Sequence, residues 1–140
     1  MNLREQLIRD EGVRYVPYKD SRGFWTNGVG HELPGPPDSL EPVTQTQVDQ
    51  WLDDDIATVK RELGEFPWYQ SLDEVRRGVF ENMAFNLGTR GLLHFVHAIA
   101  ETAKQNWVGV AVQMQSSLWA KEVGERSVRL ASQIVTGEWT

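Results

Sequence analysis

Three residues near the N-terminus have the types and the spacing of a hydrolytic site. Glu11 is followed nine residues later by Asp20, and Asp20 six residues later by Thr26. Two carboxyl groups in different environments are the usual means of cleaving a glycosidic bond, because one protonates the leaving oxygen and the other activates a water molecule. Glu11 and Asp20 are therefore candidates for acid and base chemistry, and Thr26 could help Asp20 to hold that water.

The expected position of Glu11 is the last turn of a short helix. Leu3, Leu7 and Ile8 recur at helical spacing, and Gly12 stands where a glycine commonly ends a helix. The C-terminal end of a helix carries partial negative charge, which disfavours a carboxylate. This position would suit a proton donor.

Asp20 and Thr26 fall in a segment with the pattern of a small sheet. Between residues 13 and 33, strand-type residues alternate with two turn signals, Asp20-Ser21-Arg22-Gly23 and Asn27-Gly28. We expect two or three short antiparallel strands, with Asp20 at a polar turn and Thr26 on the strand that follows.

Each of the three residues also has a structural interpretation. Glu11 could be a solvated carboxylate at a helix end, Asp20 could begin a type I turn with Gly23 at its fourth position, and Thr26 could be chosen for its β-branch. The spacing alone is therefore a hypothesis about catalysis.

The remaining chain is predicted to be helical. Thr44 with Gln47 forms a capping box that opens a helix with an apolar stripe, and Gly64 ends it. Ser71 with Glu74 forms a second capping box, whose helix stops at Gly88. Further helices are expected after Gly91, with Leu92, Phe95, Val96 and Ile99, then near Trp107 to Trp119, and from about Glu125 to Val135.

The predicted fold class is α+β and mostly helical, with a small antiparallel sheet in an N-terminal lobe that a helix joins to a helical C-terminal lobe. We expect a single domain over residues 1–140, with residues of about 13–60 in the lobe that holds the sheet, and residues of about 1–12 and 65–140 in the helical lobe. A cleft between two such lobes is a common place for a ligand.

Composition excludes several other kinds of protein. The 140 residues include no Cys, so thiol catalysis and thiolate metal sites are excluded. His94 and His97 share a helix face but have no third ligand, and no metal is expected. The net charge of −6 argues against nucleic-acid binding, and no apolar run approaches the ~20 residues of a membrane span. The N-terminus has no pattern of a secretory signal.

The context of the three residues resembles the phage lysozyme (endolysin, muramidase) family. The family pattern has a glutamate, an aspartate after eight intervening residues and a threonine after five more, followed by Gly-x-Gly-His, and all are present here, ending in Gly28-Val29-Gly30-His31. The resemblance continues through Phe85-Asn86-Leu87-Gly88 to Thr136-Gly137-Glu138-Trp139 and covers essentially the whole chain.

This resemblance implies a lysozyme-like fold and cleavage of the β-1,4 bond between N-acetylmuramic acid and N-acetylglucosamine in bacterial peptidoglycan, without a cofactor. By analogy with the family, Glu11 is the general acid, and Asp20 and Thr26 position the attacking water. The family is similar to inverting glycosidases, for which carboxyl groups ~6.5–9.5 Å apart are expected. It also implies that the chain accumulates in the cytoplasm of the host bacterium and reaches the wall after the membrane is permeabilised. We expect a monomer that does not insert into a membrane.

Several supporting residues follow by position. Arg126 matches an arginine expected to face Glu11, where its charge would oppose the effect of the helix end. We predict an ion pair between His31 and Asp55 that joins sheet to helix, with a hydrogen-bonded core histidine as the alternative. Candidates for contact with the sugars are Leu33, Phe85, Asn86, Phe95 and Gln113, of which Leu33, Phe95 and Gln113 are better explained by ordinary packing or surface positions.

The sequence also departs from the family. Glu32 falls where an apolar residue would be expected, the loop from Glu32 to Pro42 is rich in Pro, and the net charge is negative, whereas well-known members are basic. An anionic cell wall should attract a basic enzyme more than an acidic one. The alternative function is therefore a catalytically inactive peptidoglycan-binding domain on the same scaffold, although such a domain would have little reason to keep all three residues.

Overall fold

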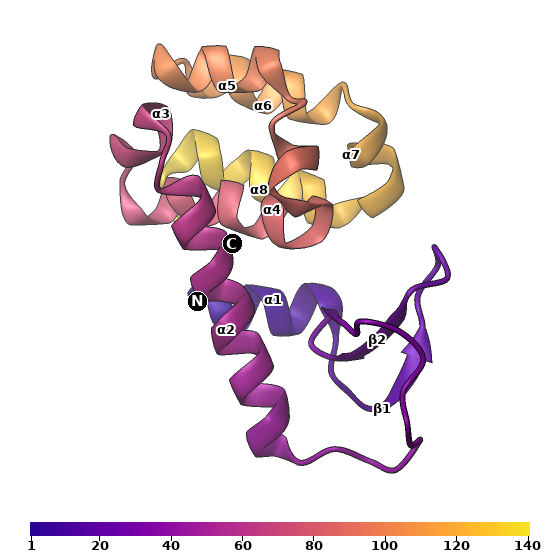
Figure 1. Cartoon of the computed structure of the whole chain (residues 1–140). Coiled ribbons are helices and arrows are strands. Elements are labelled where there is room, and N and C mark those ends of the chain that lie inside the picture. Colours follow the sequence, from indigo (N-terminus) through magenta and orange to yellow (C-terminus); the bar gives the residue numbers. More distant parts are fainter. The chain divides into compact units, whose positions relative to one another are not determined.

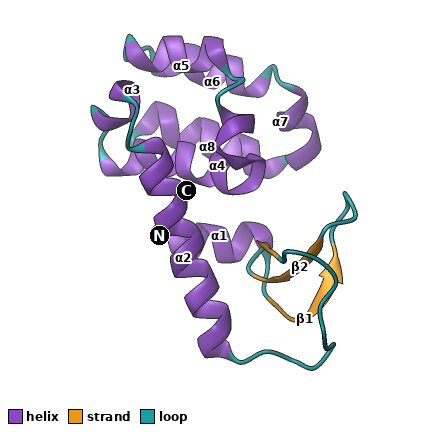
Figure 2. Cartoon of the chain, in the orientation of Figure 1, coloured by secondary structure: helices purple, strands orange, loops and turns teal.

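The computed structural model describes all 140 residues, Met1–Thr140. They form two compact units, one made of Arg4–Thr58 and the other of Met1–Leu3 with Val59–Thr140. Strands occur in the first unit, and the second is built of helices (Figure 2). The α+β, mostly helical class predicted from the sequence is therefore confirmed.

The sheet unit contains α1 (Leu3–Glu11), β1 (Arg14–Lys19), β2 (Trp25–Gly28), β3 (His31–Glu32) and most of α2 (Gln45–Leu63) (Figure 1). The three strands pair antiparallel in the order β1-β2-β3, as the turn signals predicted. Tyr18 lies opposite Thr26, and Thr26 lies opposite Glu32 on the other side. Directly opposed residues share a face of the sheet, so these three side chains form one row.

Polar contacts and a small set of buried apolar residues hold this unit together. Arg4 on α1 pairs with Asp49, at 2.9 Å, and with Asp53, both on α2. The sheet lies close to α2 at Gly28, where an added Cβ would approach the Trp51 ring to 3.3 Å. The fully buried side chains here include Leu7, Val29, Val48 and Leu52.

The helical unit consists of α3 (Pro67–Gln70), α4 (Glu74–Leu92), α5 (Val96–Ala103), α6 (Trp107–Gln115), α7 (Leu118–Val123), α8 (Glu125–Thr136) and the last residues of α2. In Figure 1, α8 lies beside α4, and it also packs against α6 and α7, while α5 packs on α6. The largest fully buried side chains of this unit's core include Phe80, Leu92, Met114, Leu130 and Ile134. No helix of the chain has both the length and the apolar composition that crossing a membrane requires.

The helix boundaries correct three predictions from the sequence. The helical path breaks at Gly88, which has φ 75° and ψ 154°, but resumes to Leu92, and α5 starts only at Val96. The helix expected near 107–119 is two helices, because Ser117 accepts a hydrogen bond from the backbone of Ala120 and starts α7. The Thr44 cap is confirmed, since its hydroxyl accepts the Gln47 N–H at 3.1 Å.

The predicted capping box of Ser71 with Glu74 is wrong. Asp73 caps α4 instead, and its side chain accepts the Arg76 N–H at 3.1 Å. The Ser71 hydroxyl donates to the carbonyl of Pro67 and so belongs to the end of α3. Asp and Ser are comparable N-caps, so local sequence does not choose between two candidates this close together.

The two units also differ from the expected lobes in one respect. Residues 4–12 group with the sheet rather than with the helical lobe. The contacts of Arg4 with α2, together with the approach of Glu11 to Gly30 described below, account for this grouping.

The cap assignment gives a stability prediction. Asp73→Ala should lower the free energy of unfolding by about 1 kcal/mol, because the first turn of α4 loses its side-chain acceptor. Ser71→Ala is the matched control. It should lower the free energy of unfolding by less, since the Ser71 hydroxyl donates only to exposed carbonyls of a one-turn helix. Urea unfolding followed by circular dichroism measures both values. An equal or larger loss for Ser71→Ala would favour the capping box read from the sequence.

Candidate active site in the sheet unit

Glu11 is the last residue of α1 and is half-buried. The helix ends there because Gly12, at φ 74°, turns the chain while its N–H still donates to the Ile8 carbonyl at 3.0 Å. The Glu11 carboxyl lies against Gly30, where an added Cβ would come within 2.9 Å of Oε2. Gly30 has φ 58°, a conformation that favours glycine, and its lack of a Cβ leaves room for the Glu11 carboxyl.

Asp20 holds the turn between β1 and β2. Its Oδ1 accepts the backbone N–H groups of Arg22 and Phe24, each at 2.9 Å, and its own N–H donates to the Phe24 carbonyl. The Gly23 N–H closes the turn onto the Asp20 carbonyl at 3.0 Å. The turn interpretation of Asp20 is therefore confirmed, and it uses one of the two carboxylate oxygens.

Thr26 lies on β2 and is 4% exposed. Its hydroxyl donates to the Phe24 carbonyl at 3.0 Å, which leaves the lone pairs of Oγ1 as acceptors. Phe24 is also the residue whose N–H binds Asp20. The side chains of Asp20 and Thr26 therefore bind the N–H and the carbonyl of the same residue, Phe24.

Tyr18 joins this group, and the sequence analysis did not single it out. It lies opposite Thr26 in the sheet and two residues before Asp20, which begins the turn after β1. Burial raises the pKa of its hydroxyl, the charge of Arg14 lowers it, and the charges of Glu11 and Asp20 raise it further. Its hydroxyl therefore lies within the electrostatic reach of both candidate carboxylates. The signal in the sequence was its place among the strand-type residues that directly precede the Asp20 turn.

His31 and Asp55 form the predicted pair, with 2.7 Å between Nδ1 and Oδ2. Both side chains are partly buried, and the imidazole stacks on Trp51 at a centroid distance of 4.7 Å and an angle of 9°. The pair therefore joins β3 to α2. Because β3 follows Gly30 directly, it also fixes the turn on which Glu11 rests.

The candidates in the helical unit differ in their surroundings within that unit, and their contact with the sugars stays a prediction. Asn86 accepts a hydrogen bond from the Trp119 indole at 2.9 Å, and Phe95 packs edge-on against the same indole. Phe85 packs against the core, and Gln113 is exposed on α6. In the sheet unit, Leu33 is half-buried and its N–H donates to Trp25.

Arg126 is 7% exposed at the start of α8, and its Nε donates to Asn82 Oδ1 at 2.9 Å. This contact orients the guanidinium within its own unit. The contact sought between Arg126 and Glu11 stays a prediction.

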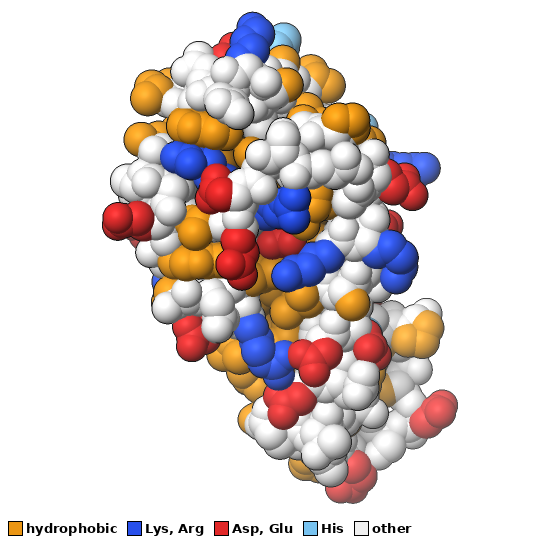
Figure 3. Space-filling view, turned by 90° about the vertical axis from the view of Figure 1, so that its left-hand side faces the viewer, with side chains coloured by type: hydrophobic (Ala, Val, Ile, Leu, Met, Phe, Trp, Pro, Cys, Tyr) orange, Lys and Arg blue, Asp and Glu red, His pale blue; other side chains and the backbone are white.

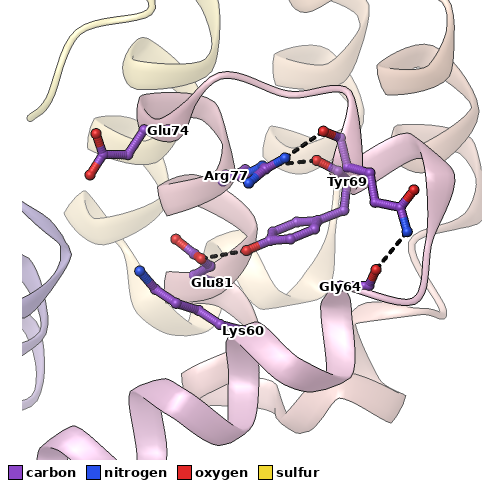
Figure 4. Close-up of a pocket in the computed structure, with 7 residues that line it drawn as sticks. Lys60, Gly64, Tyr69, Glu74, Arg77 and Glu81 are labelled. Carbon is purple, nitrogen blue, oxygen red and sulfur yellow. Dashed lines mark hydrogen bonds between the residues drawn. The ribbon is translucent and has the colours of Figure 1, made fainter.

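The helical unit also contains a polar pocket of about 410 Å³, which includes none of the candidate catalytic residues (Figure 4). The Glu81 carboxylate, 4% exposed, accepts a hydrogen bond from the Tyr69 hydroxyl at 2.6 Å. Figure 4 shows the Arg77 guanidinium directed at the backbone carbonyls of Tyr69 and Gln70, with Lys60 near Glu81. Burial raises the pKa of Glu81, although the Tyr69 bond and the charges of Lys60 and Arg77 lower it. No group of three side chains in the chain is arranged to hold a metal ion.

Comparison with known proteins places the chain in a family. The family model for phage lysozyme matches residues 9–133, and the chain belongs to this family of lysozyme-type glycosidases, which act on peptidoglycan. The chain is 25% identical to a probable T4-type lysozyme of Dictyostelium discoideum, over 97% of this chain and 95% of that protein.

Two phage proteins are also similar. The pre-baseplate central spike protein of Enterobacteria phage T4 is 26% identical over 98% of this chain, which spans 28% of that protein. A SAR-endolysin of Enterobacteria phage P21 is 35% identical over 56% of this chain and 46% of its own length. Identity is low in each case, so the reaction of this member has to be argued from its own residues.

The ion pair of the sheet unit gives a second prediction. Asp55→Asn should lower the free energy of unfolding by about 1.5–3 kcal/mol, because it weakens a partly buried charge-assisted bond to His31. Asp54→Asn is the control, since Asp54 meets only Gln50 on the exposed side of α2. Thermal unfolding of both variants tests this, and equal small losses would show that the pair contributes little.

Glu81 gives a prediction about pH. Its pKa in the folded state lies above the unfolded value, so folding favours the protonated carboxyl and stability is lost as pH rises from the unfolded pKa through the folded one. Glu81→Gln removes this titration and keeps an acceptor for Tyr69. The melting temperature of Glu81→Gln relative to wild type should therefore increase from about pH 4 to pH 7. Glu122→Gln, an exposed control, should show no such trend, and a flat difference for Glu81→Gln would contradict the argument.

Proposed function

We propose that this chain hydrolyses the β-1,4 bond between N-acetylmuramic acid and N-acetylglucosamine in bacterial peptidoglycan, with inversion. Membership of the phage lysozyme family supports the reaction class. The observation that carries the proposal is that Glu11, Asp20 and Thr26 all lie on the sheet unit, at the helix end, the turn and the buried strand position where their contacts orient them.

Glu11 acts as general acid. Its proton passes to the glycosidic oxygen as the bond between that oxygen and the anomeric carbon breaks. Contact with the Gly30 turn and partial burial hold the carboxyl in one place and limit its hydration. Positioning of this kind supplies much of an enzyme's advantage, because the donor need not be brought to the oxygen from solution.

Asp20 and Thr26 hold the attacking water. The Thr26 hydroxyl donates its hydrogen bond to the Phe24 carbonyl, so Oγ1 can act only as an acceptor for the water and accepts one of its hydrogens. The second Asp20 oxygen, Oδ2, accepts the other and takes the proton as the water oxygen bonds to the anomeric carbon. Two backbone N–H groups on Oδ1 keep this carboxylate in its orientation and stabilise its negative charge.

An inactive peptidoglycan-binding domain is the competing function. It would need neither the fixed orientation of Asp20 nor the approach of Glu11 to Gly30. The contributions of Arg126, Leu33, Phe85, Asn86, Phe95 and Gln113, the monomeric state and the accumulation in the host cytoplasm stay predictions.

Substitution of the acid tests the proposal. Glu11→Gln keeps the shape of the side chain and removes the proton, so clearing of a suspension of permeabilised bacteria should slow at least ~10²-fold. Glu41→Gln, an exposed carboxyl in the loop before α2, is the control and should clear at the wild-type rate. Circular dichroism confirms that each variant is folded.

Three outcomes separate the alternatives. Loss in Glu11→Gln alone supports a muramidase with Glu11 as the acid. Equal clearing by the wild type and Glu11→Gln would remove Glu11 from the reaction. If neither protein clears the suspension but both sediment with the walls, the chain is a binding domain.

A further inference from the structure

The polar pocket between α2, α3 and α4 contains a buried carboxylate whose charge is not matched by an ion pair. Glu81 is 4% exposed, and its Oε2 accepts the Tyr69 hydroxyl at 2.6 Å. No Lys, Arg or His nitrogen lies within 4.0 Å of this carboxylate. Its Oε1 receives no hydrogen bond from the protein, and Glu81 lines the pocket (Figure 4). We call this space the Glu81 pocket.

Packing alone does not explain a glutamate at this position. A buried carboxylate without a counter-ion lowers stability, because the charge has left water without gaining a partner. Gln would keep an acceptor for the Tyr69 hydroxyl and would avoid the charge. Groups that lower stability in this way are typical of sites that bind a ligand. Glu81 lies in the helical unit, whereas the residues proposed for hydrolysis lie in the sheet unit, so its charge indicates a ligand of its own.

Two cations line the same pocket and form no ion pair. Lys60 extends from the end of α2, and Arg77 lies about one turn before Glu81 on α4 (Figure 4). Arg77 donates to the backbone carbonyls of Tyr69 and Gln70, which carry no net charge. The charges of both cations nevertheless act on Glu81, since each lowers the pKa of its carboxyl. Both are therefore near the buried carboxylate without neutralising it at contact.

The Glu81 pocket presents equal numbers of positive and negative groups. Glu74, exposed in the first turn of α4, adds a second carboxylate, and residues 74, 77 and 81 share one face of the helix. With Lys60 these side chains are two cations and two carboxylates. The neighbouring helix α3 lies at the left of Figure 1, and Figure 3, which views the molecule from that side, shows acidic and basic side chains interspersed.

This arrangement selects a ligand that carries one charge of each sign. A simple cation would match Glu81 but would also meet the charges of Lys60 and Arg77, and a simple anion would meet the charge of Glu81. A neutral sugar would form hydrogen bonds with these groups but would leave the Glu81 charge unmatched. In a zwitterion, an ammonium group would bind Glu81 while a carboxylate binds the two cations.

The size of the pocket favours a short peptide. Its volume of about 410 Å³ lies in the usual range of small-molecule sites and is many times the ~30 Å³ that one water molecule occupies. We propose that the Glu81 pocket binds a zwitterionic dipeptide, with the terminal ammonium on Glu81 and the terminal carboxylate on Lys60 and Arg77. The charges are the same in peptides of L-residues, which protein breakdown supplies, and in peptides of D-residues, which occur in bacterial cell walls.

Matched dipeptides test the selection of both charges. The protein is titrated with L-alanyl-L-alanine and with D-alanyl-D-alanine, and amide shifts are followed by ¹⁵N NMR. Two analogues each lack one charge: the N-acetyl form has no ammonium, and the C-terminal amide has no carboxylate. The zwitterion should bind at least ~10-fold more tightly than either analogue. Tighter binding of the D,D form would identify wall peptides as the source, and tighter binding of the L,L form would identify protein breakdown.

Variants of the pocket test the assigned residues. Glu81→Gln should weaken dipeptide binding at least ~10-fold, although its melting temperature at pH 7 is not lowered. Lys60→Gln, at an exposed position, should weaken binding at least ~3-fold and remains informative if the Glu81 variant does not fold. The matched controls are Glu122→Gln and Arg61→Gln, which change exposed side chains outside the pocket and should bind as wild type does.

Several results would overturn the proposal. One is the absence of a saturating shift with either dipeptide up to about 10 mM. Others are equal affinity for the zwitterion and both analogues, equal affinity for N-acetylglucosamine, and unchanged binding by Glu81→Gln. The dipeptides contain no glycosidic bond, and the pocket contains none of the residues proposed for hydrolysis. These results are therefore independent of whether the chain is a muramidase.

Discussion

The arrangement of the sheet unit depends on the Asp20 turn. The two backbone N–H groups bound by Asp20 Oδ1 fix where β1 ends and β2 begins, and so fix the register that puts Thr26 opposite Tyr18. A slip of one residue would turn every side chain of β2 to the other face of the sheet. Thr26 would then leave the face of the sheet that Tyr18 occupies. The structural and catalytic interpretations of Asp20 are therefore compatible, because Oδ1 holds the turn and Oδ2 is left for chemistry.

The two units are stabilised in different ways. The helical unit has a continuous apolar core around Phe80, Met83 and Leu130, each fully buried. The sheet unit buries fewer large side chains and relies more on polar contacts, chiefly Arg4 with α2 and His31 with Asp55. Oriented polar groups suit a site that must hold charged side chains in a fixed geometry, because each contact specifies a direction as well as a distance.

Sequence patterns predicted what is local and missed what depends on distant contacts. Periodicity and turn residues gave the sheet, α2 and α8 because each signal lies within one element. They placed the cap of α4 at Ser71 instead of Asp73, and they did not show that the helix resumes after Gly88. Nor could they group α1 with the sheet, since the ties from Arg4 to Asp49 and Asp53 join residues more than forty positions apart.

The same limit applies to the candidate site. Glu11, Asp20 and Thr26 lie within sixteen residues, so a linear motif could reveal them. Tyr18 belongs to the group only through strand register. Asn86 and Phe95 both meet Trp119, and their contact with the sugars stays a prediction, because a helical pattern does not distinguish a packing partner from a ligand contact. The turn that Asp20 closes orders both candidate water-binding residues, because the N–H of Phe24 binds Asp20 and the carbonyl of Phe24 binds the Thr26 hydroxyl.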